Sequence, residues 1–326
     1  MSMSEKMKKK KWDVFVYGDA NIDIIIPRVE KLPKSGQEDE VSAMETFVGG
    51  GAALFTLGIG KLGFHPVFQG EIGDDIYGAM IREEFRNHNV DDCLLETSTD
   101  KKTGISLSFT NEKDRSFLTY RGTNDDLDID VINLEHVRNS SHIHITGYYG
   151  SKSHDSYLNL LKRIKKETRT TISFDLGWDS TGEWSSDIYE LFPYIDVLFM
   201  NETEATHYGR CDDAQKAALD FGRHCRIAVI KMGKKGAIAA KDGVICKVPG
   251  FQVNAVDTTG AGDSFNAGFV SGFLEKKSLQ ECITLGNACG ALSVTALGGN
   301  SGFPDEEELM TYLSVNSIDE TGGTRR

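Results

Sequence analysis

The stretch "NAVDTTGAGDSFNAGF", residues 254–269, joins a turn of small residues to the start of an apolar helical pattern. A turn made of Gly260, Ala261 and Gly262 that enters a helix directs several backbone N–H groups into one space. The helix dipole adds positive potential there, and small side chains let a phosphate approach the backbone closely. Asp263 stands at this junction, where its carboxylate could accept a proton from an attacking hydroxyl group or simply cap the helix. The motif by itself leaves both interpretations open.

Composition and charge narrow the class of protein. The chain has 326 residues, of which 39% are hydrophobic, enough for a substantial core in one large α/β domain or two smaller ones. Its formal net charge of −13 opposes non-specific binding to nucleic acid or to an anionic membrane. No apolar run reaches the length of a membrane span, and the basic start continues into acidic residues rather than a signal-peptide core. The six cysteines form no CxxC pair, which fits free thiols in a reducing cytosol, so we expect a cytoplasmic protein.

Short β-rich runs alternate with helical patterns along most of the chain. The predicted strands are 13–18, 65–70, 141–146, 170–175, 195–200 and 226–231. The predicted helices are 75–88, 154–167 and 212–222, followed by 262–275, 278–296 and 304–314. This alternation predicts an α/β fold, a three-layer sandwich with a mostly parallel central sheet and helices on both faces.

Two segments, residues 38–48 and 103–121, break this rhythm. They alternate polar and apolar residues as exposed antiparallel strands do. We expect them to form a small β-sheet that projects from the core as a lid over the site. One face of such a sheet needs a cover, which favours a homodimer formed through the lid. We expect one domain over residues 13–316, with residues 1–12 and 317–326 flexible.

Several familiar motifs are absent or misplaced. Residues 58–63 spell GxGxxG, but they follow a helix-forming stretch instead of a strand, so we expect them to end a helix rather than to bind a dinucleotide. His142 and His144 alternate on a predicted strand without nearby carboxylate or cysteine partners, which favours ordinary strand residues over metal ligands. No P-loop, HExxH or GxSxG motif occurs, which argues against the commonest classes of NTPase and hydrolase.

The opening stretch resembles the C-terminal signature of the ribokinase-like, or PfkB, family of carbohydrate kinases. Six further motifs resemble the family in order along nearly the whole chain: "YGDANID" (17–23), "VGGGAALFTLGIGKLG" (48–63), "GEIGDDIYGAMI" (70–81), "NETE" (201–204), "KMGKKGA" (231–237) and "NACGALSVTALGG" (287–299). The resemblance implies a ribokinase-like fold and an ATP-dependent kinase that phosphorylates a hydroxyl group of a small sugar.

The resemblance also implies roles on the phosphate side. Asp263 would deprotonate the substrate hydroxyl, and the amides of Gly260, Ala261, Gly262 and Asp263 would form an anion hole. The residues that would bind ATP are Asn201, Lys231, Gly233, Gly236 and Asn287. Glu204 would hold Mg²⁺ through water, because this ion usually keeps several waters. Asp257 and Thr259 match the positions where relatives bind a monovalent cation such as K⁺.

On the substrate side, the resemblance points to Asn21, Asp23, Gly49, Gly50 and Arg121. Asp23 would accept hydrogen bonds from sugar hydroxyl groups with help from Asn21, and the two glycines would admit the sugar close to the backbone. Arg121 follows Tyr120, a pair similar to one in 2-keto-3-deoxygluconate kinases, where the arginine would pair with the substrate carboxylate. We favour the alternative that Arg121 is a solvated charge at a strand end.

Two departures from the family pattern leave the substrate open. Many relatives carry Asn where this chain has Leu54, and many have D-P-N-x-R where it reads "DLGWD" at 175–179. We expect a neutral sugar, because Asp179 stands where relatives place an arginine. The alternatives are a kinase of a sugar acid such as 2-keto-3-deoxygluconate and a nucleoside kinase, whose apolar acceptor pocket Leu54 and Tyr148 leave open. A non-catalytic sugar sensor is a further alternative, against which the retained Asp263 argues.

Overall fold

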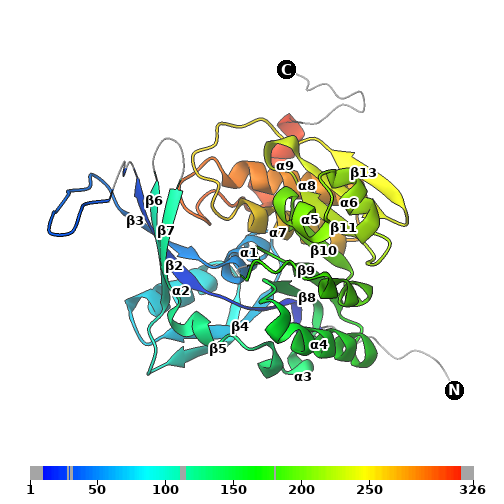
Figure 1. Cartoon of the computed structure of the whole chain (residues 1–326), viewed down its shortest axis with the longest axis horizontal. Coiled ribbons are helices and arrows are strands. Elements are labelled where there is room, and N and C mark those ends of the chain that lie inside the picture. Colours follow the sequence, from blue (N-terminus) through cyan, green and yellow to red (C-terminus); the bar gives the residue numbers. More distant parts are fainter. Residues whose placement is uncertain (1–9, 28, 30–31, 111–114, 180, 317–326) are drawn as a thin grey trace.

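The computed structural model describes residues 10–27, 29, 32–110, 115–179 and 181–316 (Figure 1). The large sheet consists of β1 (Trp12–Tyr17), β4 (Pro66–Gly73), β5 (Asp91–Ser98), β8 (Ser140–Thr146), β9 (Thr171–Asp175), β10 (Val197–Asn201), β11 (Ala228–Lys231), β12 (Ala237–Lys241) and β13 (Val244–Val248). Its order is β13-β12-β11-β10-β9-β8-β1-β4-β5, and its strand pairs are parallel except at β12, which runs antiparallel to both neighbours. The predicted, mostly parallel sheet is confirmed.

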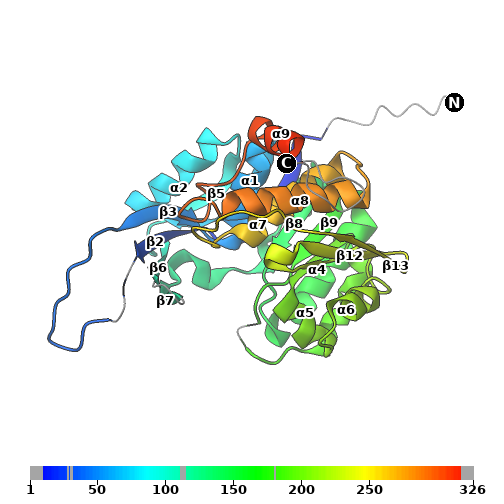
Figure 2. The same ribbon diagram turned by 90° about the horizontal axis from the view of Figure 1, so that it is seen from above.

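Helices cover both faces of this sheet (Figure 2). One face carries α1 (Gly51–Lys61), α2 (Ile76–Asn87), α7 (Ala261–Leu274), α8 (Leu279–Ser293) and α9 (Glu306–Val315). The other carries α3 (Leu134–Arg138), α4 (His154–Glu167), α5 (Glu202–Gly209) and α6 (Ala214–Phe221). Alternate residues of β1 point to opposite faces, so Val14 and Val16 join the first core and Phe15 and Tyr17 the second. This is the predicted three-layer sandwich.

The carboxyl ends of neighbouring parallel strands bring four polar residues to one edge of the sheet. Thr146 at the end of β8 pairs in register with Asp175 of β9, and Asn201 of β10 pairs with Lys231 of β11. Phe199 pairs with Asp175, which places Asn201 two residues further along the same edge. In open α/β sheets, ligands bind outside this carboxyl edge.

A second sheet stands beside the sandwich, at the left of Figure 1. It contains β3 (Glu45–Gly49), β2 (Asn21–Pro27), β6 (Gly104–Thr110) and β7 (Arg115–Tyr120), in that order. The predicted segment 103–121 is therefore two antiparallel strands, whereas residues 38–44 carry no strand and only 45–49 of the predicted 38–48 do. The missed partner is β2. Its residues Ile24 and Ile25 are buried on opposite faces of the strand, so the segment contains an apolar run, Ile24–Ile26, instead of a clean alternation.

The remaining differences lie in short or polar elements. The strands β5, β12 and β13 and the helices α3 and α5 were not predicted; β5 reads DDCLLETS and β12 is rich in alanine, so neither has a strong period-two pattern. The GxGxxG glycines end a helix as expected, because α1 stops at Lys61 and the N–H of Leu62 donates to the Gly58 carbonyl. None of the helices in the described ranges is long and apolar enough to cross a bilayer.

Candidate active site

Helix α7 starts at the turn predicted to bind phosphate. Gly260 precedes it with φ 71°, and a Cβ there would come within 2.3 Å of the Gly299 carbonyl oxygen, so only glycine fits this turn. The first N–H groups of a helix lack acceptors within the helix, which leaves the amides of Gly262 and Asp263 directed beyond its start. The Ala261 amide is turned toward the Thr258 carbonyl at 3.4 Å.

Asp263 lies in the first turn of α7, where it is partly buried. Burial raises the pKa of Asp263 well above its ordinary value; the negative charge of Asp175 adds to this effect, while the Lys231 ammonium opposes it. A carboxylic acid with a raised pKa is suited to exchange a proton near neutral pH. The residue predicted to be the base therefore stands where its protonation is easily changed.

A buried ion pair faces Asp263 from the sheet edge. The Nζ of Lys231 lies 2.5 Å from the Oδ2 of Asp175, and the Nδ2 of Asn266 donates to the same oxygen at 2.5 Å. A Cβ on Gly262 would lie 3.3 Å from the Lys231 Nζ, so the ammonium stands beside the start of α7. Asp175 and Asn266 were not predicted as site residues; Asp175 was noticed only where the chain departs from the family pattern.

Asn201 and Glu204 form a capping box at the start of α5. The Glu204 amide donates to the Asn201 Oδ1 at 2.8 Å, and the Asn201 amide donates back to the Glu204 Oε2 at 2.8 Å. The Asn201 Nδ2 also donates to the Glu204 Oε1 at 2.7 Å. Burial, followed by the charge of Asp175, raises the pKa of Glu204 to about 7. The pair fixes the helix start, and Glu204 stands within the electrostatic reach of Lys231.

A cavity of about 330 Å³ lies beside Lys231, which lines it. It brings together four residues predicted to bind ATP, namely Lys231, Gly233, Gly236 and Asn287, with Ala261 and Gly262 of the α7 start. The Asn287 Nδ2 donates to the Val248 and Pro249 carbonyls at 3.2 Å, so it also anchors the loop after β13. The cavity also has apolar walls. The sequence did not predict the residues that form them, which are Phe251, Val253, Phe265, Ala291 and Val294. Asn201 does not line this cavity.

Asp23 and Asn21 lie together on the inner side of the lid. The Asn21 Nδ2 donates to the Asp23 Oδ1 at 2.8 Å, and burial raises the pKa of Asp23 to about 6. A Cβ on Gly49 would lie 2.4 Å from the Asp23 Oδ1, so the space beside Gly49, predicted for the sugar, is filled by the Asp23 carboxylate. Gly50 has φ 92°, and its Cβ would meet the Asp19 carbonyl at 2.8 Å. A side chain at either position would collide with Asp23 or Asp19, so the local fold needs glycine at both.

Asp19 and Gly51 are site residues that the sequence interpretation missed. The Asp19 carboxylate accepts hydrogen bonds from the amides of Gly51 and Ala52, each at 3.1 Å, and so caps the start of α1. A Cβ on Gly51 would lie 3.4 Å from the Asp263 Oδ1. Gly51 therefore keeps the approach to Asp263 open. The third glycine of "GGG" was the available signal for it.

The other predicted residues have structural partners. The Asp257 Oδ1 accepts hydrogen bonds from the amide and the hydroxyl of Thr259 at 2.9 and 2.8 Å, and its Oδ2 accepts one from the Gly298 amide at 3.0 Å. Arg121 is half exposed, and its Nε pairs with the Asp125 Oδ1 at 2.8 Å. No group of three or more His, Cys, Asp or Glu that could hold a metal occurs within the described ranges.

Two features noted from the sequence lie in the interior. Leu54 is buried, and its methyl groups lie 3.1 Å from where a Cβ on Gly299 would stand. His142 and His144 are buried on β8, and both bond to the Ser173 hydroxyl of β9 at 2.7 Å. The histidines are strand residues, as the sequence indicated.

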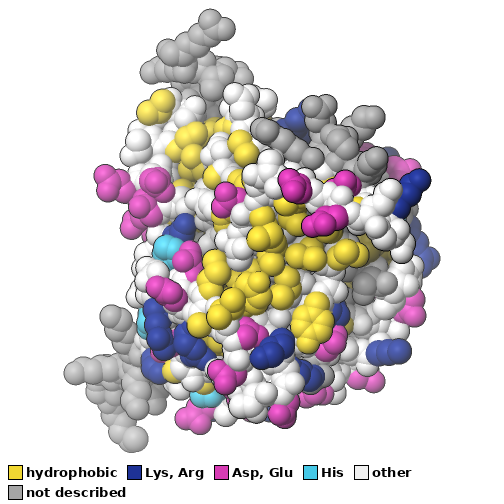
Figure 3. Space-filling view, turned by 90° about the vertical axis from the view of Figure 1, so that its left-hand side faces the viewer, with side chains coloured by type: hydrophobic (Ala, Val, Ile, Leu, Met, Phe, Trp, Pro, Cys, Tyr) yellow, Lys and Arg dark blue, Asp and Glu magenta, His cyan; other side chains and the backbone are white. Residues whose placement is uncertain are grey.

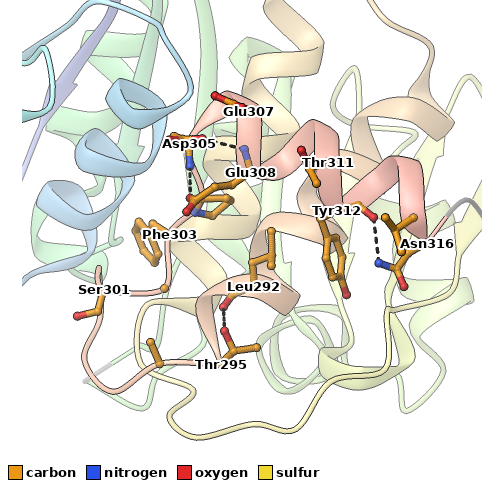
Figure 4. Close-up of a pocket in the computed structure, with 14 residues that line it drawn as sticks. Leu292, Thr295, Ser301, Phe303, Asp305, Glu307, Glu308, Thr311, Tyr312 and Asn316 are labelled. Atoms are coloured by element: carbon orange, nitrogen blue, oxygen red, sulfur yellow. Dashed lines mark hydrogen bonds between the residues drawn. The ribbon is translucent and has the colours of Figure 1, made fainter.

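A second cavity, of about 670 Å³, lies between the end of α8 and α9 (Figure 4). Asp305 and Glu308 line it, but they cap α9 through reciprocal hydrogen bonds between side chain and backbone. Figure 4 shows Leu292, Phe303 and Tyr312 around it, and no predicted site residue lines it. This cavity is larger than the one beside Lys231, but no predicted site residue lines it, so it is not the candidate active site.

Comparison with known proteins decides the family. The model of the pfkB family of carbohydrate kinases matches residues 11–306. The chain belongs to this family. An ATP-dependent ribose-1-phosphate kinase from Halopiger xanaduensis is 29% identical over 91% of this chain and 96% of its own length. A ribokinase from Haemophilus influenzae is 28% identical over 91% of this chain and 97% of its own length.

Solved structures agree with this placement. The structure of the Arabidopsis thaliana ribokinase complexed with ribose and ATP superposes with a TM-score of 0.80 at 25% identity, covering 93% of this chain and 98% of that chain. A putative ribokinase II from E. coli in complex with ATP and Mg²⁺ has a TM-score of 0.80 at 21% identity, covering 93% of this chain and 99% of its own, and shares the fold. The predicted ribokinase-like fold and the predicted class, an ATP-dependent sugar kinase, are confirmed.

The raised pKa of Asp263 makes a prediction about stability. Above its ordinary value of 3.8 the unfolded carboxyl loses its proton, whereas the folded one keeps it to much higher pH, so the free energy of unfolding falls as the pH rises between the two values. Asp263→Asn removes this loss. At pH 8 we expect the variant to be more stable than wild type, with a higher Tm, and we expect this difference to shrink as the pH falls.

Calorimetry or thermal denaturation across the pH range checks this expectation. Asp155→Asn is the matched control, because Asp155 is an exposed acid in the first turn of α4. A variant at position 263 that is no more stable than wild type at pH 8 would contradict the raised pKa of Asp263.

Proposed function

We propose that the protein transfers the γ-phosphoryl group of ATP to a hydroxyl group of a small neutral sugar, with Asp263 as the general base. The observation that carries this proposal is the position of Asp263: it lies in the first turn of α7, the Lys231 charge acts on it, and its Oδ1 lies 3.4 Å from where a Cβ on Gly51 would stand. Phosphoryl transfer mainly needs positioning and charge stabilisation, together with a carboxylate that accepts the hydroxyl proton. The amides of Gly262 and Asp263 and the α7 dipole supply the stabilisation.

The nucleotide would occupy the 330 Å³ cavity beside Lys231. Gly233 and Gly236 border it with φ 54° and 93°, so the backbone can approach a nucleotide without side-chain obstruction. The apolar walls suit an adenine ring, with Asn287 at one side. The triphosphate would then run toward the start of α7.

Glu204 fits Mg²⁺ through water rather than directly. Both of its carboxylate oxygens already accept hydrogen bonds from Asn201, and each retains a lone pair for a water molecule. Mg²⁺ bound there would neutralise charge on the triphosphate.

We also propose a K⁺ site at Asp257 and Thr259. Their side-chain oxygens and the carbonyls of residues 293–298 are the hard oxygen ligands that such an ion takes. The hydrogen bond from the Gly298 amide to Asp257 supports this site, because it brings the two segments together.

Contacts around the acceptor side favour a neutral sugar. Asp23 and Asn21 offer hydrogen-bonding groups, whereas the Arg121 guanidinium is paired with Asp125 and half exposed. Asp179, the second acid of the "DLGWD" segment (175–179), is buried. It accepts hydrogen bonds from the amides of Thr181 and Trp184, so it organises the loop that follows β9. A sugar carboxylate would therefore meet no free cation among these residues.

The nucleoside alternative loses its two sequence arguments. Leu54 packs against Gly299, and the Tyr148 hydroxyl bonds to His154 at 3.0 Å with the ring 3% exposed. Both side chains belong to the core, and neither forms an apolar acceptor pocket. The neutral sugar remains the better supported substrate.

We also propose that two copies associate through the apolar face of the lid. Strand register places one set of residues on this face: Ile22, Ile24, Ile26, Ile105, Leu107, Leu118 and Tyr120. Helix α2 covers its β2 end, but Leu118 is 58% and Tyr120 53% exposed. Figure 3 shows hydrophobic side chains gathered in a broad patch on the side that carries the lid. Large apolar patches of this kind mark interaction surfaces.

Two further proposals concern the extent of the domain and the place of the protein in the cell. Residues 13–316 act as one unit, supported by β2 and β6 of the lid pairing along their full length while α2 packs on β2. The protein works in the cytoplasm, supported by six free cysteines, of which Cys225, Cys282 and Cys289 are buried. The predicted flexible ends lie outside the described residues, except for residues 10–12.

The central prediction concerns Asp263→Asn. We expect turnover of ATP with the best sugar from a panel to fall by about 10²–10⁴-fold, because the general base is lost, while nucleotide binding stays within a few-fold. Coupled ADP release measures the first quantity and calorimetry the second, with Asp155→Asn as the control. Turnover within a few-fold of wild type would remove Asp263 from the mechanism, and a wild type that binds sugars without turnover would favour the sensor.

Arg121→Ala separates neutral sugars from sugar acids. If Arg121 is the exposed partner of Asp125, its loss should change kcat/KM by less than about threefold, as most surface substitutions do. A substrate carboxylate held by Arg121 would instead cost about 30-fold or more. Kinetics with the best neutral sugar and with 2-keto-3-deoxygluconate decide, and a best substrate that is acidic and sensitive to Arg121 would contradict the neutral-sugar proposal.

The lid proposal predicts the mass of the particle in solution. Wild type should run as a dimer in light scattering, and Leu118→Asp with Tyr120→Asp should run as a monomer, because two charges cannot be buried unpaired in an apolar interface. Val244→Asp is the control, since Val244 is 67% exposed on β13, in the other sheet. A monomeric wild type, or a dimer that the double variant leaves intact, would exclude this interface.

A further inference from the structure

The Lys231–Asp175 pair has a position that a purely structural ion pair would not need. Both side chains come from the carboxyl edge of the sheet and are nearly buried, with 13% and 9% of their side-chain surface exposed. The Nζ–Oδ2 distance is 2.5 Å, and the ammonium lies within contact range of a Cβ placed on Gly262. The pair thus borders the start of α7, where the transferred phosphoryl group is expected.

Charged groups face this ammonium from several elements. Asp175 of β9, Glu204 of α5 and Asp263 of α7 act on Lys231. Burial alone would lower the pKa of Lys231, but the three carboxylates together raise it. Asp19, before β2, acts on Asp263 from the α1 side, and His144 of β8 is buried and kept neutral by a lowered pKa. Lys231 therefore stays charged at neutral pH in a strongly acidic setting.

Asn266 connects this pair to the helix that carries the proposed base. It lies three residues after Asp263 on α7, and residues at this spacing share one side of a helix. Its Nδ2 donates to the same Asp175 oxygen that the Lys231 ammonium contacts. Asp175 is thereby fixed from two directions, and through it the ammonium is fixed relative to α7.

We propose that Asp175 is a positioning residue that holds the Lys231 ammonium at the start of α7, where Lys231 contacts the transferring phosphoryl group. The proposal rests on the proposed function and adds to the nucleotide role of Lys231. Negative charge on that group spreads over three oxygens in the transition state, and a fixed cation in a dry site stabilises it without reorganising. A lysine has a flexible stem, so without a partner its ammonium would be free to leave this position.

A comparable pair at the opposite end of the sheet provides the control. Lys165 of α4 and Asp196, just before β10, lie 2.5 Å apart, with 32% and 10% of their side-chain surface exposed. Asp196 also accepts a hydrogen bond from the Ile172 amide at the start of β9, so this pair joins elements far from Asp263. Lys165→Met removes a similar ion pair without touching the proposed site.

The first test measures nucleotide binding and needs no turnover. With Mg²⁺ present, Lys231→Met should weaken binding of the non-hydrolysable analogue adenylyl imidodiphosphate about 10-fold or more beyond its effect on ADP, since a charge-assisted hydrogen bond to the γ-phosphate is lost. Lys231→Arg should retain most of this preference, and Lys165→Met all of it. Equal losses on both nucleotides with Lys231→Met would overturn the proposal.

The second test uses the acid limb of the kcat/KM–pH profile, which reports the free enzyme's base. Asp175→Asn removes a charge that raises the pKa of Asp263, so the limb should move to lower pH; Lys231→Met removes a charge that lowers it, so the limb should move to higher pH. Asp175→Asn should also reduce kcat more than tenfold and weaken binding of adenylyl imidodiphosphate more than binding of ADP, because the ammonium remains but is misplaced. Shifts in the same direction, or unshifted limbs in both variants, would contradict the assignment.

A third measurement keeps the proposal falsifiable if these variants do not fold. In wild type, the ¹⁵Nζ resonance of Lys231 should respond strongly to adenylyl imidodiphosphate and weakly to ADP, and an equal response would overturn the contact. If wild type turns over none of the sugars, the proposed function fails, whereas the two nucleotide experiments still decide the role of Lys231.

Discussion

Several carboxylates buried close together repel one another, and this repulsion is the constraint on which the site depends. Asp175, Glu204 and Asp263 come from different elements, and the Lys231 ammonium lies among them. Burial, followed by the charge of Asp175, raises the pKa of Glu204 and of Asp263. Such clustering is unfavourable for stability, and active sites are where it is retained, because a base with a raised pKa can exchange protons near neutral pH.

The fold creates this cluster through the common direction of its strands. Parallel strands deliver Thr146, Asp175, Asn201 and Lys231 to one edge, and the starts of α1 and α7 meet above it. Each helix start depends on glycine: Gly260 enters α7 in a left-handed conformation, and Gly51 at the start of α1 leaves room beside Asp263. The lid then brings Asp23 to the same region, where Asp257 influences it. The turns at the starts of α1 and α7 therefore determine where the reactive groups lie.

Much of this could be predicted from the sequence, and the failures have physical causes. The alternation of strands and helices predicted the large sheet, and the order of motifs predicted the family. Strand β2 was missed because both of its faces are covered at Ile22 and Ile25, which hides the period-two signal. Asp175 and Asn266 were missed because their partnership joins residues 91 positions apart, a contact that no local pattern shows. The contact between Gly49 and the Asp23 carboxylate also joins different strands, so the sequence could not show it.

The most direct measurement of the central claim is a crystal structure with ADP, aluminium fluoride, Mg²⁺ and the best sugar bound. Aluminium fluoride imitates the transferring phosphoryl group. We predict that it binds to the amides at the start of α7 and to the Lys231 ammonium, with a sugar hydroxyl within hydrogen-bonding distance of the Asp263 carboxylate and ADP in the cavity lined by Asn287. A nucleotide phosphate bound elsewhere, for example in the cavity between α8 and α9, or a sugar hydroxyl that no carboxylate contacts, would contradict the account.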